Sequence, residues 1–90
     1  MSLWSNIVSG SKLERKLEIK KETESFLEQY NLMLVELYTD RGILLGSQRY
    51  DEMTGVEKFD ALHEIDSRII QVRDTIEQEE LRCKRRLKQL

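Results

Sequence analysis

The stretch "LHEIDSRIIQVRDTI", residues 62–76, decides the fold. Its apolar residues recur in steps of three, four, three and four, at Leu62, Ile65, Ile69, Val72 and Ile76. This alternation is the spacing of a coiled coil, in which one helix presents a narrow apolar seam to another helix. The stretch therefore predicts a long amphipathic helix that needs a second helix to face it.

The beginning of this helix is indicated by "TGVE", residues 54–57. A threonine followed three residues later by a glutamate is a capping box, whose two side chains satisfy free backbone N–H groups at a helix start. The apolar pattern continues beyond Ile76 through Cys83, Leu87 and Leu90, although Glu79 and Glu80 interrupt it. We expect a helix over about residues 55–90.

A comparable pattern precedes this helix in the chain. "SKLE", residues 11–14, has the capping-box form again, which predicts a helix start near residue 12. Spacings of three, four and seven then place apolar residues on one stripe as far as Leu45. Gly46 predicts the end of this helix, because glycine accepts the left-handed conformation common at helix C-termini. We therefore expect a helix over about 12–45 and a connector over about 46–54.

A connector this short favours antiparallel neighbours, so the fold predicted is an all-α, coiled-coil-like hairpin of two antiparallel helices. A turn centred near residue 50 would pair residues whose numbers sum to about 100, such as Leu34 with Ile65 and Leu37 with Leu62. Tyr30 and Phe59 are expected in the core. The alternative is that the two helices stay apart and each pairs in another chain.

Composition agrees with one small helical domain. The chain has 90 residues, no proline, four glycines and 36% charged residues, a mixture that favours long helices with solvated faces. Residues 1–10 are expected to form a flexible N-terminal arm, leaving 11–90 for the hairpin. The sequence lacks a basic leader, a bilayer-length apolar run and a second cysteine to pair with Cys83, so a cytoplasmic, intracellular protein is expected.

The first helix carries more apolar surface than one facing helix can cover. Seven of its residues span an arc of about 140° at 100° per residue, with Leu32 and Val35 outside that arc. We expect self-association or a helical partner from another protein to complete a bundle, the simplest case being a twofold four-helix bundle. The predicted partner-binding apolar strip consists of Phe26, Leu27, Tyr30, Leu32, Met33, Leu34, Val35, Leu37 and Tyr38.

Basic residues gather where the two chain ends should meet. In the register that sums to 100, residues 82–88 lie beside residues 12–21, and this open end has a net charge of +8, so the rest of the chain carries −10. Such an end is solvated, meets an acidic protein surface, or binds nucleic acid or an anionic membrane. Its members are Lys12, Arg15, Lys16, Lys20, Lys21, Arg82, Lys84, Arg85, Arg86 and Lys88.

Residues that carry chemistry are few. His63 and Cys83 are twenty residues apart on one helix, a separation of about 30 Å, so they cannot act as a nucleophile and base within one chain. Asp60 and His63 have the i, i+3 spacing of a bundle metal site, but the second such motif that this site requires is absent from the sequence. No catalytic, cofactor-binding or metal-binding residue is predicted, and we expect no enzyme.

These observations favour a protein–protein interaction module, a small helical adaptor or assembly subunit that binds a partner helix through the apolar strip. Two alternatives remain open. One is a small export or assembly chaperone that uses the same groove for a partner's amphipathic helix. The other is a factor that binds nucleic acid or an anionic surface through the basic open end.

Overall fold

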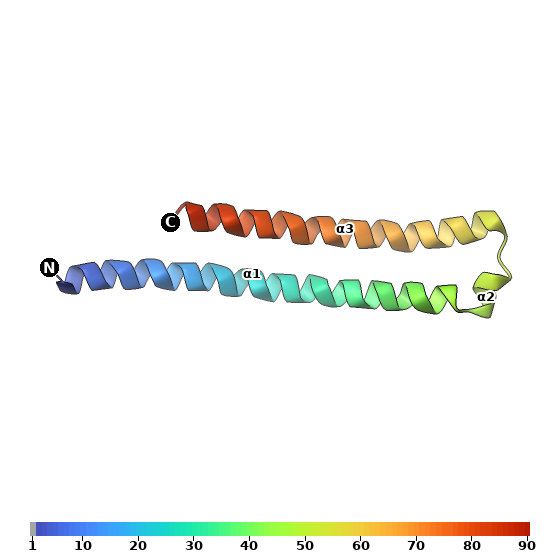
Figure 1. Ribbon diagram of the computed structural model, residues 1–90, viewed down its shortest axis with the longest axis horizontal. Helices are drawn as coiled ribbons and strands as arrows, with labels where there is room; N and C mark the ends of the chain where they lie inside the picture. The colour runs from blue at the N-terminus through green and yellow to red at the C-terminus, as the bar shows by residue number, and fades with distance from the viewer. Residues whose placement is uncertain (1) are drawn as a thin grey trace.

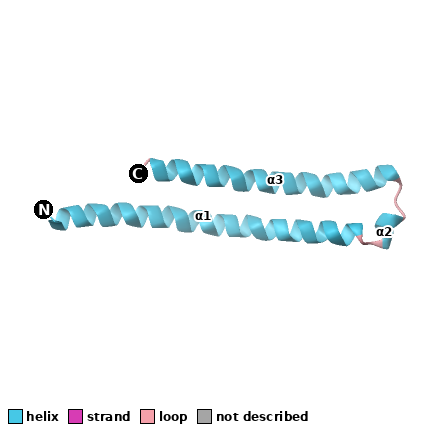
Figure 2. Cartoon of the chain, in the orientation of Figure 1, coloured by secondary structure: helices cyan, strands magenta, loops and turns pink. Residues whose placement is uncertain are grey.

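The computed structural model describes the backbone of residues 2–90 and the side chains of residues 11–90. It is a hairpin of two long antiparallel helices, α1 (Ser2–Leu45) and α3 (Gly55–Lys88), joined by the short helix α2 (Gln48–Asp51), as Figures 1 and 2 show. The molecule measures 75 × 18 × 9 Å between Cα atoms, and its described residues contain no strand. The predicted all-α hairpin is confirmed.

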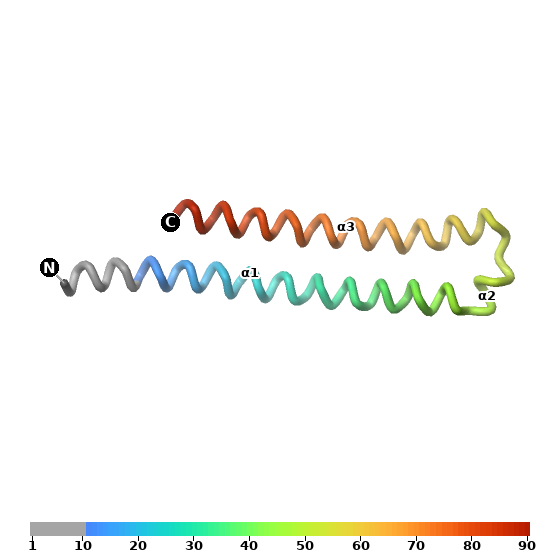
Figure 3. The backbone as a smooth tube through the Cα atoms, viewed as in Figure 1, coloured from blue at the N-terminus to red at the C-terminus, as the bar shows by residue number. Residues whose placement is uncertain are grey.

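Helix α1 begins earlier than the sequence pattern indicates. Its first residue is Ser2, whereas a start near residue 12 was expected. Ser11 and Glu14 therefore lie inside α1, where backbone N–H groups have intrahelical acceptors, so a capping box has no helix start to serve. A flexible arm is predicted over residues 1–10. These residues are drawn in grey in Figure 3, and their side chains lie outside those described.

The end of α1 leads directly into α2. α1 ends at Leu45, as predicted, and the N–H of Gly46 donates to the carbonyl of Gly42 at 3.1 Å. The expected left-handed glycine is wrong, because no residue within the described chain has a positive φ. Instead, the Ser47 hydroxyl donates to the Leu44 carbonyl at 2.7 Å and accepts from the N–H of Tyr50 at 3.1 Å. Ser47 thereby contacts the end of α1 and caps the start of α2.

The start of α3 is the predicted capping box. The Thr54 hydroxyl accepts from the N–H of Glu57 at 3.2 Å, and the Glu57 carboxylate accepts from the N–H of Thr54 at 3.3 Å. Both bonds satisfy donors that have no partner within the helix. This cap fixes the point at which the chain enters α3.

Replacing Thr54 by alanine is therefore expected to lower the free energy of unfolding by about 1 kcal/mol, the usual cost of losing an N-cap. Thr39→Ala is the matched control, because the Thr39 hydroxyl only donates to the Val35 carbonyl one turn earlier in an exposed stretch of α1. Urea unfolding followed by circular dichroism measures both. Equal stability of the two variants would contradict a role for the cap.

Two ion pairs between the helices define the register. Arg41 Nε lies 2.8 Å from Asp66 Oδ1, and Arg86 Nη1 lies 3.4 Å from Glu22 Oε2. Residue numbers at the same level therefore sum to 107–108, so the predicted sum of 100, with Leu34 beside Ile65, is wrong. The chain reverses later because α2 adds a helical turn beyond α1 before Thr54. The shift is close to one heptad, which explains why the wrong register also matched apolar residues with apolar residues.

The core is a single seam between α1 and α3. Ile19, Ile69 and Val72 are buried, together with Thr23, whose hydroxyl donates to the Ile19 carbonyl at 2.9 Å. No described side chain is less than 2% exposed. The hairpin thus buries one line of residues on each helix and leaves the other faces in contact with solvent.

Phe59 departs from the predicted core and is 66% exposed. The three–four alternation, counted back from Leu62, reaches Lys58 rather than Phe59. Lys58 is half-buried at that seam position, with its Nζ 5.3 Å from the centre of the Tyr50 ring. Phe59 lies one residue, or about 100°, away from the seam.

Candidate protein-binding surface

The structure divides the predicted apolar strip between two environments. Its half-buried members turn toward α3: Phe26, Leu27, Tyr30, Leu34 and Leu37. The rings of Phe26 and Tyr30 stack with centroids 4.6 Å apart. Its exposed members are Leu32, Met33, Val35 and Tyr38, with exposed fractions of 59%, 45%, 61% and 48%. The strip therefore supplies part of the hairpin seam and, separately, apolar residues that no helix covers.

Exposed apolar residues of both helices share one side of the hairpin. At about 100° per residue, Tyr38 and Val35 lie about 70° and 130° from the middle of the α1 seam. Ile70 lies about 120° from the α3 seam in the same rotational sense. Because α1 and α3 are antiparallel, equal rotations on the two helices lead to the same side. We call this surface the open face and define it by Val35, Tyr38, Leu45, Phe59, Ile70 and Leu81.

The two interhelical ion pairs agree with this division into sides. Arg41 and Asp66 rotate toward the open face, whereas Glu22 and Arg86 both lie about 80–90° from their seams in the opposite sense. Met33 lies on this second side, with Glu22. The contacts between Arg41 and Asp66 and between Glu22 and Arg86 are thus each made on one side of the hairpin, as the helical geometry requires.

Tyr38 and Ile70 form the centre of the open face. Their numbers sum to 108, so they lie at the same level on neighbouring helices. Beside them α1 carries a shallow, mainly apolar groove of about 380 Å³, lined by Glu24, Leu27, Glu28, Asn31, Leu32 and Val35. The open face thus combines aromatic and aliphatic side chains from both helices with a hollow beside them, a surface suited to a packed helix.

The predicted basic end is spread along the hairpin. In the observed register residues 82–88 lie beside about 20–26, rather than beside 12–21. Lys12, Arg15 and Lys16 lie at levels beyond Leu90, where α1 extends past the last residue of α3 in Figure 1. Leu13 and Leu17 lie on the same part of α1 and are 59% and 54% exposed. The ten basic residues therefore do not form one compact cluster.

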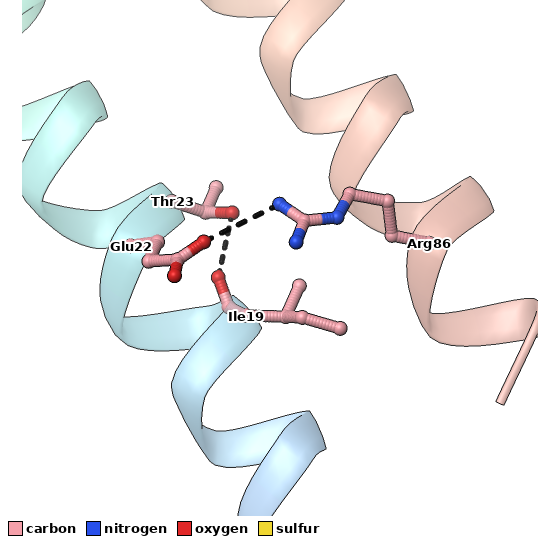
Figure 4. A network of polar contacts seen from close by, with 4 residues as sticks. All are labelled: Ile19, Glu22, Thr23 and Arg86. Carbon is pink, nitrogen blue, oxygen red and sulfur yellow. Dashed lines mark hydrogen bonds and ion pairs between the residues drawn. The ribbon is translucent and has the colours of Figure 1, made fainter.

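Carboxylates are interspersed with the basic residues. Figure 4 shows Arg86 of α3 reaching across to Glu22, next to the bond between Thr23 and Ile19. A hollow of about 400 Å³ near this pair is lined by Arg15, Glu18, Ile19, Glu22, Arg86, Gln89 and Leu90. Its lining carries two arginines and two glutamates, so the charges of this hollow balance.

The residues with chemically reactive side chains, His63 and Cys83, lie apart from each other. His63 is exposed and stacks on Phe59 with ring centroids 5.6 Å apart. Cys83 is half-buried on α3, at the level of about residue 25 rather than beside residues 12–21. Among the described residues, no group of three or more histidine, cysteine, aspartate or glutamate side chains is arranged to hold a metal ion.

The ion pair between Arg41 and Asp66 is expected to contribute little to stability. Its side chains are 37% and 44% exposed, and water and salt screen such pairs to below about 1 kcal/mol. A double-mutant cycle with Arg41→Ala and Asp66→Ala, followed by urea unfolding, measures the coupling. A coupling energy well above 1 kcal/mol would show that this pair is desolvated in solution.

The structure defines a class of protein, an all-α hairpin of two antiparallel helices. In the part of the chain that is described, no helix is both long and apolar enough to cross a membrane. No protein-family model, curated protein or solved structure matches the chain.

Proposed function

We propose that the protein is a non-enzymatic interaction module that binds amphipathic helices on its open face. The observation that carries this proposal is the position of Tyr38 and Ile70, which lie at the same level on neighbouring helices and are 48% and 60% exposed. Exposed apolar side chains that two helices present on one side supply the apolar part of an interaction site.

The thin core supports the same function. A two-helix hairpin buries few side chains, and small domains of this type gain stability when further helices complete a bundle. A helix laid along the open face would cover apolar residues of both α1 and α3 at once. It would contact them through its own residues at i, i+3, i+4 and i+7.

The test uses a model amphipathic peptide of leucine and lysine, about 18 residues long, because so short a helix is marginal alone in water. Mixing it with the intact protein is expected to raise its helical content. Circular dichroism measures this gain as the difference between the spectrum of the mixture and the sum of the two separate spectra. Ile70→Asp should abolish the effect, because a carboxylate would then be buried without a partner.

Met33→Asp is the matched control, since Met33 is 45% exposed but lies on the other side of α1. It should leave the peptide's gain in helicity unchanged. An unmodified protein that neither raises the peptide's helicity nor self-associates would overturn the proposal. An equal loss in both aspartate variants would show that the peptide binds elsewhere.

A further inference from the structure

We infer that the occupant of the open face is a second copy of this chain. The two hairpins pack face to face and antiparallel. Their twofold axis runs across the open face, perpendicular to the helices, along the line from Tyr38 to Ile70. This inference rests on the proposed function and deepens it by naming the partner. Three features of the described chain support it: the spacing of apolar residues, the distribution of charge and the size of the face.

Apolar residues on the α3 part of the open face are symmetric about Ile70. Phe59 and Leu81 lie eleven residues before and after it, and eleven residues are close to three full helical turns. The exposed fractions of Phe59, Ile70 and Leu81 are 66%, 60% and 40%. A twofold axis at Ile70 places Phe59 against Leu81 of the second copy and Ile70 against its own equivalent.

On α1 the same axis pairs Tyr38 with its own equivalent, whereas Val35 and Leu45 come level with Arg41 and Asn31 of the second copy. Tyr38 lies at the level of Ile70 and would meet Tyr38 of the second copy, a position in which tyrosine is a favoured interface residue. Asp66 also rotates toward this face, but it already has a partner in Arg41 at 2.8 Å. Ile70 also lines a hollow with Arg73, Asp74, Ile76, Glu77 and Glu80, so the apolar residues at the axis are flanked by charged residues of both signs.

Charge distinguishes this arrangement from the other twofold stacking. An axis parallel to the long axis of the hairpin would place basic residues 82–88 of one copy beside those of the other. Residues 81–90 contain five basic and no acidic residues, whereas residues 22–80 carry a net charge of −10. The antiparallel arrangement instead places 82–88 over residues 52–58 of the second copy, which contain Glu52, Glu57 and Lys58 and have a net charge of −1, so the basic residues no longer face each other.

The size of the shared surface suits a stable dimer. With the axis at Tyr38, the two hairpins overlap over about thirty levels, which is about 45 Å at 1.5 Å per residue. The hairpin is 18 Å wide between Cα atoms, so the overlap has a projected area of about 800 Å² per copy, large enough to hold a specific interface, which buries about 800 Å² of accessible surface per partner.

Cysteine cross-linking tests the geometry. In a Cys83→Ala background, Ile70→Cys is expected to form a disulfide-linked dimer in air-oxidised, intact protein, because the two residues at the axis face each other. Phe59→Cys and Leu81→Cys should each cross-link poorly alone and efficiently when the two variants are mixed. Met33→Cys is the control, and about tenfold less dimer is expected from it, since its thiols are too far apart to bridge.

Two results would overturn the inference. One is efficient cross-linking between Tyr38→Cys and Ile70→Cys chains in a mixture, without linkage of either variant to itself, because that pattern belongs to the other stacking. The second is a single-chain mass for the unmodified protein at every concentration. If that monomer still raises the helicity of the leucine–lysine peptide, only the self-pairing fails and the proposed function stands; if it does not, both fail.

Discussion

Replacing Ile69 by aspartate is expected to unfold the hairpin, whereas the same change at the neighbouring Ile70 is expected to leave it helical. Ile69 is 5% exposed in the seam, and Ile70 is 60% exposed on the open face. The Ile69 variant loses a buried side chain, worth about 2–5 kcal/mol in isoleucine-to-alanine changes, and also buries an unpaired carboxylate. Losses of this size approach the whole stability of a small domain.

Far-ultraviolet circular dichroism of both variants checks this expectation at low protein concentration. The Ile69→Asp protein should lose most of its helical signal, and Ile70→Asp should retain it. Because the two residues have the same side chain and are adjacent, helix propensity and composition are matched. Similar helical content in both variants would contradict the placement of Ile69 in the seam.

The second large effect concerns association. Ile70→Asp is expected to raise the dissociation constant of the dimer at least about 100-fold. The substitution occurs twice in each dimer, it removes a central apolar contact, and it places two carboxylates opposite each other. Sedimentation equilibrium measures the constant. Met33→Asp should change it less than about threefold, because Met33 lies outside the interface and surface substitutions have small effects.

An equal weakening in the Met33 and Ile70 variants would contradict the choice of face.

The salt dependence of the dissociation constant tests the same interface independently. Residues 82–88 would face Glu52 and Glu57 of the second copy, which are exposed, so high salt should weaken the dimer modestly, by about tenfold or less. Complete dissociation by salt would mean that charge rather than the apolar face holds the copies together.

The hairpin itself was predictable because its signals are local. The spacing from Leu62 to Ile76 and the Thr54–Glu57 capping box depend on residues within two or three turns, and both predict the observed α3. The register was not predictable to the same degree. It depends on α2, a four-residue helix whose hydrogen bonds with Ser47 extend the chain before it reverses, and a one-heptad shift preserves the apolar match.

The surface was predicted only in part, for a related reason. The sequence identified Val35 and Tyr38 as members of one strip with Leu34 and Leu37, but a wide apolar arc does not say which edge the second helix covers. Ile19 was missed because its neighbours are polar, although its spacing of seven from Phe26 was a usable signal. The sequence places Phe59 in the core because it lies three residues before Leu62, a helical spacing, whereas the structure has Lys58 at that seam position.

The mass of the unmodified protein in solution tests the central claim most directly. Light scattering after size exclusion, over a dilution series, should give twice the chain mass of 10.7 kDa at high concentration and approach the single-chain value on dilution. The same series with the leucine–lysine peptide should show the peptide competing for the open face. A mass of 10.7 kDa throughout, with no bound peptide, would contradict the claim that this face binds helices.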